Sequence, residues 1–195
     1  MAARTPGRRR GGGTAVKIVV TGPFAAGKTT LIRTISEITV LSTEKDITDG
    51  TRSRKAETTV AMDFGRITID RDLVLYLFGT PGQDRFEFMW EILGEGMLGY
   101  VVLVDGGRED SLQEAVGILA AFRSMAAKIP FVVAVNRTQG LDPAGEERIR
   151  EALSLDERVA VVPCDATDRE SVKAVLLALL HTVVDSLDRP AAVHG

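Results

Sequence analysis

The sequence predicts an α/β fold in which a mostly parallel sheet of six strands is covered by helices on both faces. Short apolar runs typical of buried strands recur along the chain and alternate with longer segments whose apolar residues repeat at helical spacing. A glycine-rich turn joins the first of these strands to the first helix. With 195 residues, of which 45% are hydrophobic and 26% charged, the chain is long enough for one packed domain.

The expected elements start with a buried strand at 16–20 and a helix at 29–38. The polar segment 41–58 has no periodicity and is expected to be a long loop, which in a compact domain usually has a function. Strands at 60–70 and 73–78 form an antiparallel hairpin around a short polar turn. The remaining expected elements alternate between buried strands and helices, at 100–104, 112–125, 131–135, 159–162 and 172–187.

The domain is expected to span residues 14–188, between a tail at 1–13 and a flexible segment at 189–195. The first tail is rich in arginine and glycine and has no acidic residue, a composition typical of disorder. Its four arginines make it either a solvated tail or a weak tether to an anionic membrane or an acidic partner.

The composition excludes several classes of protein. The net charge of −3 argues against a nucleic-acid-binding domain, because neutralising phosphates requires clustered lysine and arginine. The single cysteine, Cys164, cannot form an internal disulfide, which fits a reducing cytosol. The sequence has no secretory signal and no apolar run of membrane-spanning length. We therefore expect a cytoplasmic protein, and the basic tail leaves open a peripheral contact with the inner face of the cell membrane.

The strongest functional signal is the segment 22–29, Gly-Pro-Phe-Ala-Ala-Gly-Lys-Thr, which matches the phosphate-binding pattern G-x-x-x-x-G-K-[ST] in full. In such a P-loop, glycines permit a tight turn in which successive N–H groups and the helix N-terminus face a phosphate. The lysine is expected to reach the β- and γ-phosphates, and the first threonine to coordinate Mg²⁺. The expected phosphate-binding residues are Gly22, Ala25, Ala26, Gly27, Lys28, Thr29 and Thr30.

Four further motifs bear on the kind of nucleotide-binding protein. They are, in chain order, TTVAMDF at 58–64, LFGTPGQD at 77–84, VAVNRTQ at 133–139 and PCDAT at 163–167. In this order and spacing they resemble the motifs of Ras-superfamily small GTPases, over almost the whole chain from 16 to 187. The two middle motifs, at 58–64 and 77–84, look most like those of a bacterial branch, the MglA-type polarity GTPases and the conservon GTPases of actinomycetes.

The resemblance implies a P-loop fold of the small G-domain type, acting as a regulatory switch that binds Mg-GTP and Mg-GDP and hydrolyses GTP slowly. Thr59 would coordinate Mg²⁺ together with Thr29, and the Gly82 N–H would sense the γ-phosphate. Gln83 would orient the attacking water, and an arginine of the long loop, Arg54 or its neighbour Arg52, would stabilise charge on the transferred phosphoryl group.

The resemblance also implies how the base is bound. Asn136 would tie the base loop to the P-loop, and the Ala166 N–H would contact the guanine carbonyl. Arg137, Gln139 and Asp165 complete the expected nucleotide-binding set.

Three residues depart from the family pattern. Gly79 stands where most members carry an aspartate that holds Mg²⁺ through water, so metal binding is expected to be weaker. Phe24 either crowds the γ-phosphate or packs under the P-loop. Gln139 replaces the aspartate that accepts from two guanine N–H groups, so we expect only a weak preference for guanine. These departures leave open a nucleotide-locked scaffold with little turnover, or an adenine-nucleotide-binding P-loop protein.

The partners expected for this chain also follow from the resemblance. It implies a roadblock-type regulatory protein and a sensor-kinase-like effector. The apolar residues that follow Gln83, among them Phe88 and Trp90, either pack into the core or form a surface that a partner contacts.

Overall fold

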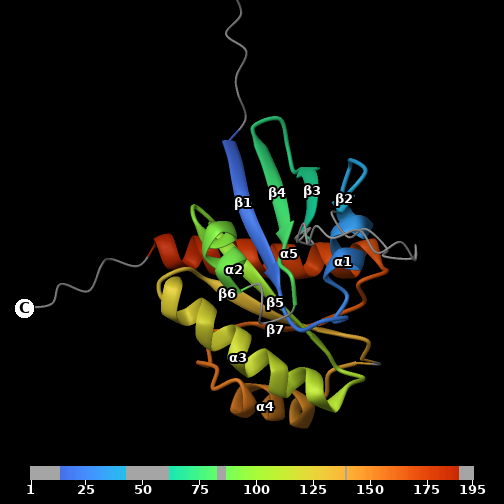
Figure 1. Ribbon diagram of the computed structural model, residues 1–195, viewed down its shortest axis with the longest axis vertical. Coiled ribbons are helices and arrows are strands. Elements are labelled where there is room, and N and C mark those ends of the chain that lie inside the picture. Colours follow the sequence, from blue (N-terminus) through green and yellow to red (C-terminus); the bar gives the residue numbers. More distant parts are fainter. Residues whose placement is uncertain (1–13, 43–61, 83–86, 139, 189–195) are drawn as a thin grey trace, which may run out of the picture.

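Seven strands form one sheet in the order β2-β3-β4-β1-β5-β6-β7 (Figure 1). The computed structural model describes residues 14–42, 62–82, 87–138 and 140–188. The tails expected at 1–13 and 189–195, and most of the long loop expected at 41–58, lie outside these residues.

The strands and helices alternate along most of the chain. Strand β3 is antiparallel to β2 and β4, and the other neighbouring strands are parallel. The elements are β1 (Thr14–Thr21), α1 (Lys28–Ile35), β2 (Leu41–Ser42), β3 (Asp63–Thr68), β4 (Leu73–Gly79), α2 (Glu87–Gly94), β5 (Gly99–Asp105), α3 (Glu109–Met125), β6 (Phe131–Asn136), α4 (Pro143–Ala152), β7 (Val161–Cys164) and α5 (Arg169–Leu187).

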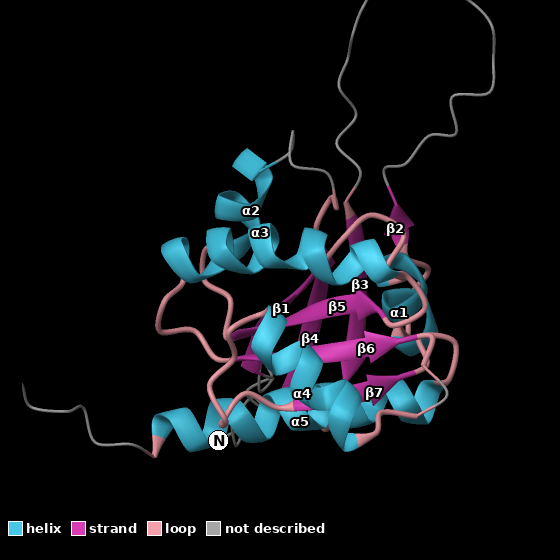
Figure 2. Cartoon of the chain, turned by 90° about the horizontal axis from the view of Figure 1, so that it is seen from below, coloured by secondary structure: helices cyan, strands magenta, loops and turns pink. Residues whose placement is uncertain are grey.

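The α/β fold with a mostly parallel sheet is confirmed, with one strand more than the six expected. The additional strand is β2, which has two residues and lies at the edge of the sheet beyond β3 (Figure 2). Its residues begin the polar segment that was expected to be a loop. So short a strand carries no periodicity that a sequence pattern could reveal.

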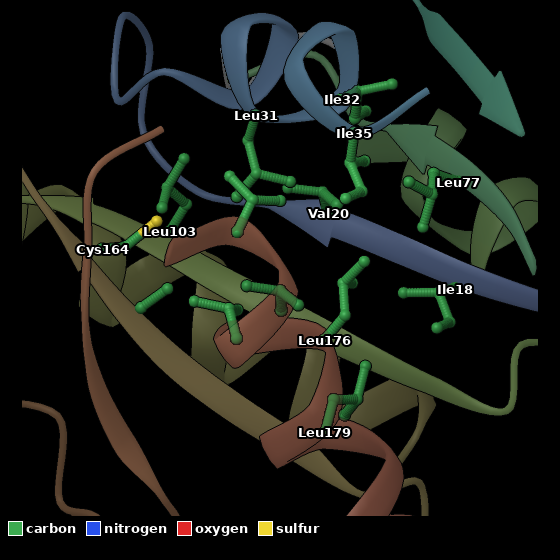
Figure 3. Close-up of a cluster of buried hydrophobic side chains, with 14 of the residues drawn as sticks. Ile18, Val20, Leu31, Ile32, Ile35, Leu77, Leu103, Cys164, Leu176 and Leu179 are labelled. Atoms are coloured by element: carbon green, nitrogen blue, oxygen red, sulfur yellow. The ribbon is translucent and has the colours of Figure 1, made fainter. Parts of the chain in front are cut away.

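Two apolar cores lie on opposite faces of the sheet because side chains alternate along each strand. Ile18 and Val20 of β1 belong to the core beneath α1 and α5, which Figure 3 shows in close-up. Val19, between them, belongs to the other core, which is covered by α2, α3 and α4. The helices on both faces leave the loops at the carboxyl ends of the parallel strands free to form a site.

None of the described helices is long and apolar enough to cross a membrane.

Helix α2 is fastened to the core by Trp90, while its neighbour Phe88 is exposed. The Trp90 ring lies 5.9 Å from that of Phe122 in α3. Its indole Nε1 donates a hydrogen bond of 3.0 Å to the Pro81 carbonyl. Of the two interpretations of this apolar segment, packing into the core therefore holds for Trp90, whereas Phe88 is exposed and remains available to a surface contact.

We expect Trp90→Leu to lower the free energy of unfolding by about 2–4 kcal/mol, because it leaves a void and leaves the buried Pro81 carbonyl without its hydrogen bond from Trp90. Trp90→Phe keeps most of the ring packing and should cost about half as much. Urea unfolding followed by circular dichroism measures both. Phe88→Leu, on the exposed side of the same helix, is the control and should change the value by less than about 0.5 kcal/mol. Equal stability of wild type and Trp90→Leu would contradict this account.

Candidate nucleotide-binding site

The loop between β1 and α1 makes a turn that requires glycine at both ends. Gly22 has φ 140° and Gly27 has φ 106°. A Cβ at Gly22 would lie 2.1 Å from the Leu103 carbonyl oxygen in β5, and one at Gly27 would lie 2.5 Å from Nδ2 of Asn136. The two glycines thus allow the loop to press against the neighbouring strand ends.

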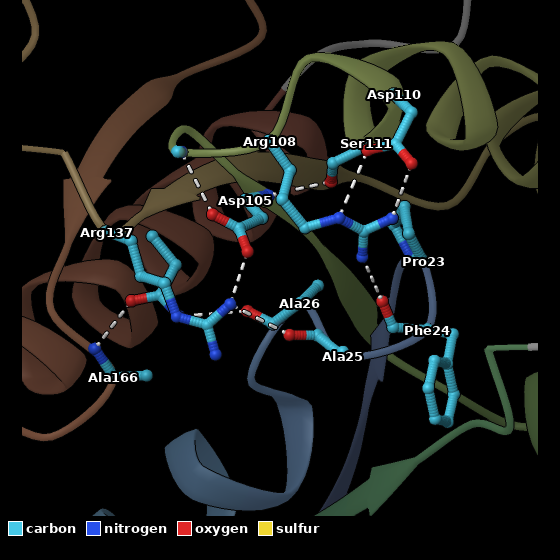
Figure 4. Close-up of polar contacts among 12 residues, drawn as sticks. Pro23, Phe24, Ala25, Ala26, Asp105, Arg108, Asp110, Ser111, Arg137 and Ala166 are labelled. Atoms are coloured by element: carbon cyan, nitrogen blue, oxygen red, sulfur yellow. Dashed lines mark hydrogen bonds and ion pairs between the residues drawn. The ribbon is translucent and has the colours of Figure 1, made fainter.

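Five successive carbonyls of this loop, from Gly22 to Ala26, each accept a hydrogen bond from a side chain. Lys28 Nζ donates to the first and second at 2.7 and 2.6 Å. Arg108 donates to the third at 2.9 Å, Arg137 to the fourth at 3.0 Å, and Asn136 to the fifth at 2.9 Å. Figure 4 shows the two arginines approaching the loop from neighbouring elements. In a trans peptide the C=O and N–H point in opposite directions, so the bonds to the Pro23, Phe24 and Ala26 carbonyls turn the N–H groups of Phe24, Ala25 and Gly27 toward the other side of the loop, where they can face an anion. Pro23 has no N–H, and the Ala26 N–H donates 3.3 Å to the Pro23 carbonyl.

A buried carboxylate fixes one of these arginines. Asp105, at the end of β5, is 3% exposed and forms an ion pair with Arg137. Its carboxylate also accepts a hydrogen bond of 2.9 Å from the Gly107 N–H, and its backbone N–H donates one of 2.9 Å to the Ser111 hydroxyl oxygen. Arg137, expected among the base-binding residues, thus bonds to the P-loop and to Asp105.

Asn136 uses both ends of its amide to join the P-loop to the loop after β7. Its Nδ2 donates to the Ala26 carbonyl, and its Oδ1 accepts from the Ala166 N–H at 3.0 Å. That N–H was expected to contact a guanine carbonyl, but here its hydrogen bond is made to Asn136. The neighbouring Asp165 is exposed, and hydrogen bonds from the Thr167 side chain and backbone lower its pKa below the ordinary value.

A carboxylate lies beside the threonine that was expected to coordinate Mg²⁺. The Thr29 hydroxyl donates a hydrogen bond of 2.5 Å to Oδ2 of Asp63, which is 8% exposed at the start of β3. A hydroxyl that donates to a carboxylate keeps its lone pairs for a metal. Mg²⁺ prefers oxygen ligands and is usually held by one or two carboxylates together with substrate phosphates, so Thr29 and Asp63 fit this ion.

Gly79 was expected to weaken metal binding because it removes an anionic anchor, and that expectation stays a prediction. Asp63 nevertheless places a carboxylate in the same part of the fold. The two residues face each other across the β3–β4 hairpin. A Cβ at Gly79 would lie 3.1 Å from Cβ and 3.2 Å from Oδ2 of Asp63. The glycine therefore makes room for a carboxylate that comes from the adjacent strand. The sequence contained a signal for this pairing, because residues 63 and 79 lie symmetrically about the centre of the expected turn at Arg71.

The segment that follows β4 lies directly against the P-loop. A Cβ at Gly82 would lie 2.6 Å from the Phe24 backbone nitrogen and 2.7 Å from Lys28 Nζ. The Phe24 side chain is 55% exposed, and Figure 4 shows its ring pointing away from the polar contacts. The ring therefore points away from these contacts (Figure 4), but it lies exposed and does not pack under the loop.

Several residues that were expected in the site take no part in the contacts described above. Thr30 lies exposed in α1. The others, which lie outside the described residues, are Thr59, Gln83, Gln139, Arg54 and Arg52. Among the described residues, no group of three or more His, Cys, Asp or Glu gathers to hold a metal.

The fold and this loop define a P-loop nucleotide-binding protein: a parallel sheet, a glycine-bounded turn into a helix, a lysine and a threonine with a carboxylate partner. Residues 20–186 match the family model described as conserved hypothetical ATP binding protein, and the chain belongs to this family. An uncharacterized protein of Methanocaldococcus jannaschii is 34% identical over 127 residues, which cover 63% of this chain and 70% of that protein.

Membership of this family corrects the resemblance to MglA-type and conservon GTPases. The match covers nearly the same stretch of chain as the resemblance did. The error has a physical reason: the P-loop pattern and the strand–helix alternation serve phosphate binding in general and carry no information about the base. The residue that would have specified guanine was Gln139, which already departs from the GTPase pattern. The partners that the resemblance implied, a roadblock-type regulator and a sensor-kinase-like effector, remain untested predictions.

We expect Asp63→Asn to raise the Mg²⁺ concentration that half-saturates nucleotide binding by about 10- to 100-fold, because hydrogen bonds to charged groups contribute about 1.5–3 kcal/mol. Titration of Mg²⁺ against a fluorescent nucleoside triphosphate measures this. Asp72→Asn, in the exposed turn of the same hairpin, is the matched control and should have no effect. The exchange Asp63→Gly with Gly79→Asp moves the carboxylate to the facing strand and should recover part of the loss. An unchanged Mg²⁺ dependence in Asp63→Asn would remove this residue from the metal site.

Proposed function

We propose that the protein binds ATP with Mg²⁺ on its P-loop, prefers adenine to guanine nucleotides, and hydrolyses the bound triphosphate slowly. Mg²⁺ would be held by the Thr29 hydroxyl and the Asp63 carboxylate together with phosphate oxygens. The single observation that carries the base preference is the hydrogen bond from the Ala166 N–H to Asn136.

The two purines differ at the position that this N–H would read. Guanine has a carbonyl at C6, which needs a donor, whereas adenine has an amino group, which needs an acceptor. The Ala166 N–H is committed to Asn136, and the Asn136 amide is committed at both ends. The Ala166 N–H is therefore not available to a guanine carbonyl at this point.

An acceptor for the adenine amino group lies next to it in the chain. Asp165 accepts two hydrogen bonds from Thr167, both at Oδ1. Its other carboxylate oxygen, Oδ2, takes part in neither of these two bonds, and the residue is exposed. We propose that this oxygen accepts from the adenine amino group. The description of the matched family as ATP binding supports the same base.

We expect slow hydrolysis because the two described arginines beside the loop, Arg108 and Arg137, bond to other groups of the protein. A guanidinium that faces the transferred phosphoryl group can accelerate its transfer by several orders of magnitude. Arg108 and Arg137 instead bond to carbonyls on the outer side of the loop and to carboxylates. We therefore expect turnover by the protein alone on the order of 10⁻³ s⁻¹ or below, comparable with an unassisted P-loop site.

Competition of unlabelled ATP and GTP against a fluorescent ATP analogue tests the base preference. We expect ATP to bind at least about tenfold more tightly than GTP, because an unpaired carbonyl at a partly buried site costs about 1–3 kcal/mol. Lys28→Ala, which removes the phosphate-binding ammonium, is the control that should bind neither. Asp165→Asn should reduce the preference for ATP without weakening GTP. GTP binding as tight as ATP binding, or tighter, would contradict the proposal.

A further inference from the structure

Arg108 connects the P-loop to helix α3. It stands immediately before the first residue of α3, and its NH1 donates 2.9 Å to the Phe24 carbonyl. On the other side, its Nε and NH2 bond to the two carboxylate oxygens of Asp110 at 3.1 and 3.0 Å. NH2 also bonds to Glu114 at 3.1 Å. Figure 4 shows the guanidinium lying between Asp110 and the loop.

This contact differs from the other side-chain bonds to the loop. Lys28 lies in the phosphate-binding motif itself, and Asn136 and Arg137 lie together at the end of β6 within one base-loop motif. Arg108 instead directly precedes α3, and the two carboxylates that it bonds to lie on that helix. The hydrogen bond to Asp110 raises the pKa of Arg108 and lowers that of Asp110, so both groups stay charged.

The peptide that Arg108 holds is a strained part of the loop. The residue after Phe24 is Ala25, with φ 60°, a left-handed conformation that is unfavourable for a residue with a Cβ. Such a conformation persists only where the surroundings hold it. The Ala25 N–H belongs to the same peptide unit as the Phe24 carbonyl and points the opposite way. A bond to that carbonyl therefore orients a donor toward the phosphate side.

We propose that Arg108 is a positioning residue that sets how long a nucleotide stays in the P-loop, and that Asp110 and Glu114 hold it in place for this task. The proposal rests on nucleotide binding at this loop. A two-point grip on a carboxylate fixes the guanidinium plane, so the bond to Phe24 costs little additional side-chain entropy. Without that grip the long side chain leaves the Phe24 carbonyl more often, and the phosphate-facing donors lose their order.

The experiment measures how fast the full-length protein releases adenine nucleotides that carry a fluorophore on the ribose. Stopped-flow chase of the labelled ADP and ATP, with Mg²⁺, gives the dissociation rate. We expect Arg108→Gln to raise this rate about tenfold, as for the loss of one charge-assisted hydrogen bond. Asp110→Asn should raise it roughly three- to fivefold, since the guanidinium keeps Glu114.

Asp156→Asn is the matched control. Asp156 faces Arg158 at the same two-residue spacing, at 3.9 Å and on an exposed surface. Removing its charge should leave the dissociation rate unchanged. Arg108→Lys can still donate to Phe24 but cannot grip Asp110 at two points, so its rate should lie between those of wild type and Arg108→Gln. If Arg108→Gln destabilises the fold, Arg108→Lys provides the test of the proposal in its place.

The double variant Arg108→Gln, Asp110→Asn separates positioning from a general effect of Asp110 on the helix. Asp110 lies in the first turn of α3, where a negative charge stabilises a helix regardless of Arg108. If Asp110 acts through Arg108, the double variant should release nucleotide as fast as Arg108→Gln alone. Additive effects, or unchanged rates in Arg108→Gln and Asp110→Asn, would overturn the inference. Failure of the wild type to bind either labelled nucleotide would instead overturn the proposed function, and the inference with it.

Discussion

The site depends on one constraint: the carbonyls of the loop between β1 and α1 are all held by side chains. Each of the five from Gly22 to Ala26 accepts a side-chain hydrogen bond, and four different residues supply the donors. Three of those residues lie at or just after the carboxyl ends of β5 and β6, the next two strands after β1 in the sheet. The parallel strand order thus brings the donors to the loop, and the loop can present its N–H groups to an anion because its carbonyls are engaged elsewhere. Asp105 and Asp110, which bond to the arginines, extend the same network into the core and onto α3.

The proposed Mg²⁺ site, Thr29 with Asp63, shows how one chemical role can move between strands. The carboxylate beside Thr29 comes from the antiparallel strand β3, and the facing position in β4 is a glycine that leaves room for it. What the chemistry requires is a buried carboxylate near the threonine hydroxyl, whichever strand supplies it. In this protein the carboxylate is supplied by Asp63 in β3, directly across the hairpin from the glycine at position 79 in β4.

The sequence predicted the architecture well because the architecture depends on patterns that are local. Buried strands such as 131–135 and the glycine–lysine turn at 22–29 are visible in a short window of residues. Contacts between distant segments were harder to predict: Asp63 could have been found from the symmetry of the hairpin about Arg71, but its polar role was not recognised. Arg108 carries no such signal, since an arginine next to two acidic residues at the start of a helix is usually only solvated. The family was misjudged because the P-loop pattern and the strand–helix alternation are shared by many phosphate-binding proteins. The motifs at 133–139 and 163–167 were interpreted as guanine-binding although Gln139 departs from the pattern, and the contacts of the Ala166 N–H appear only in three dimensions.

The proposed base preference links these parts, since it depends on the same asparagine that holds the last P-loop carbonyl. Asn136 Nδ2 donates to the Ala26 carbonyl, and Asn136 Oδ1 accepts from the Ala166 N–H. The residue that orders the P-loop therefore also occupies a donor that guanine would need. The most direct test of the account is to purify the full-length protein gently in Mg²⁺ buffer, denature it, and identify the released nucleotide by chromatography and mass spectrometry. The account predicts that the retained nucleotide is ATP or ADP. Recovery of GTP or GDP as the main species would contradict it.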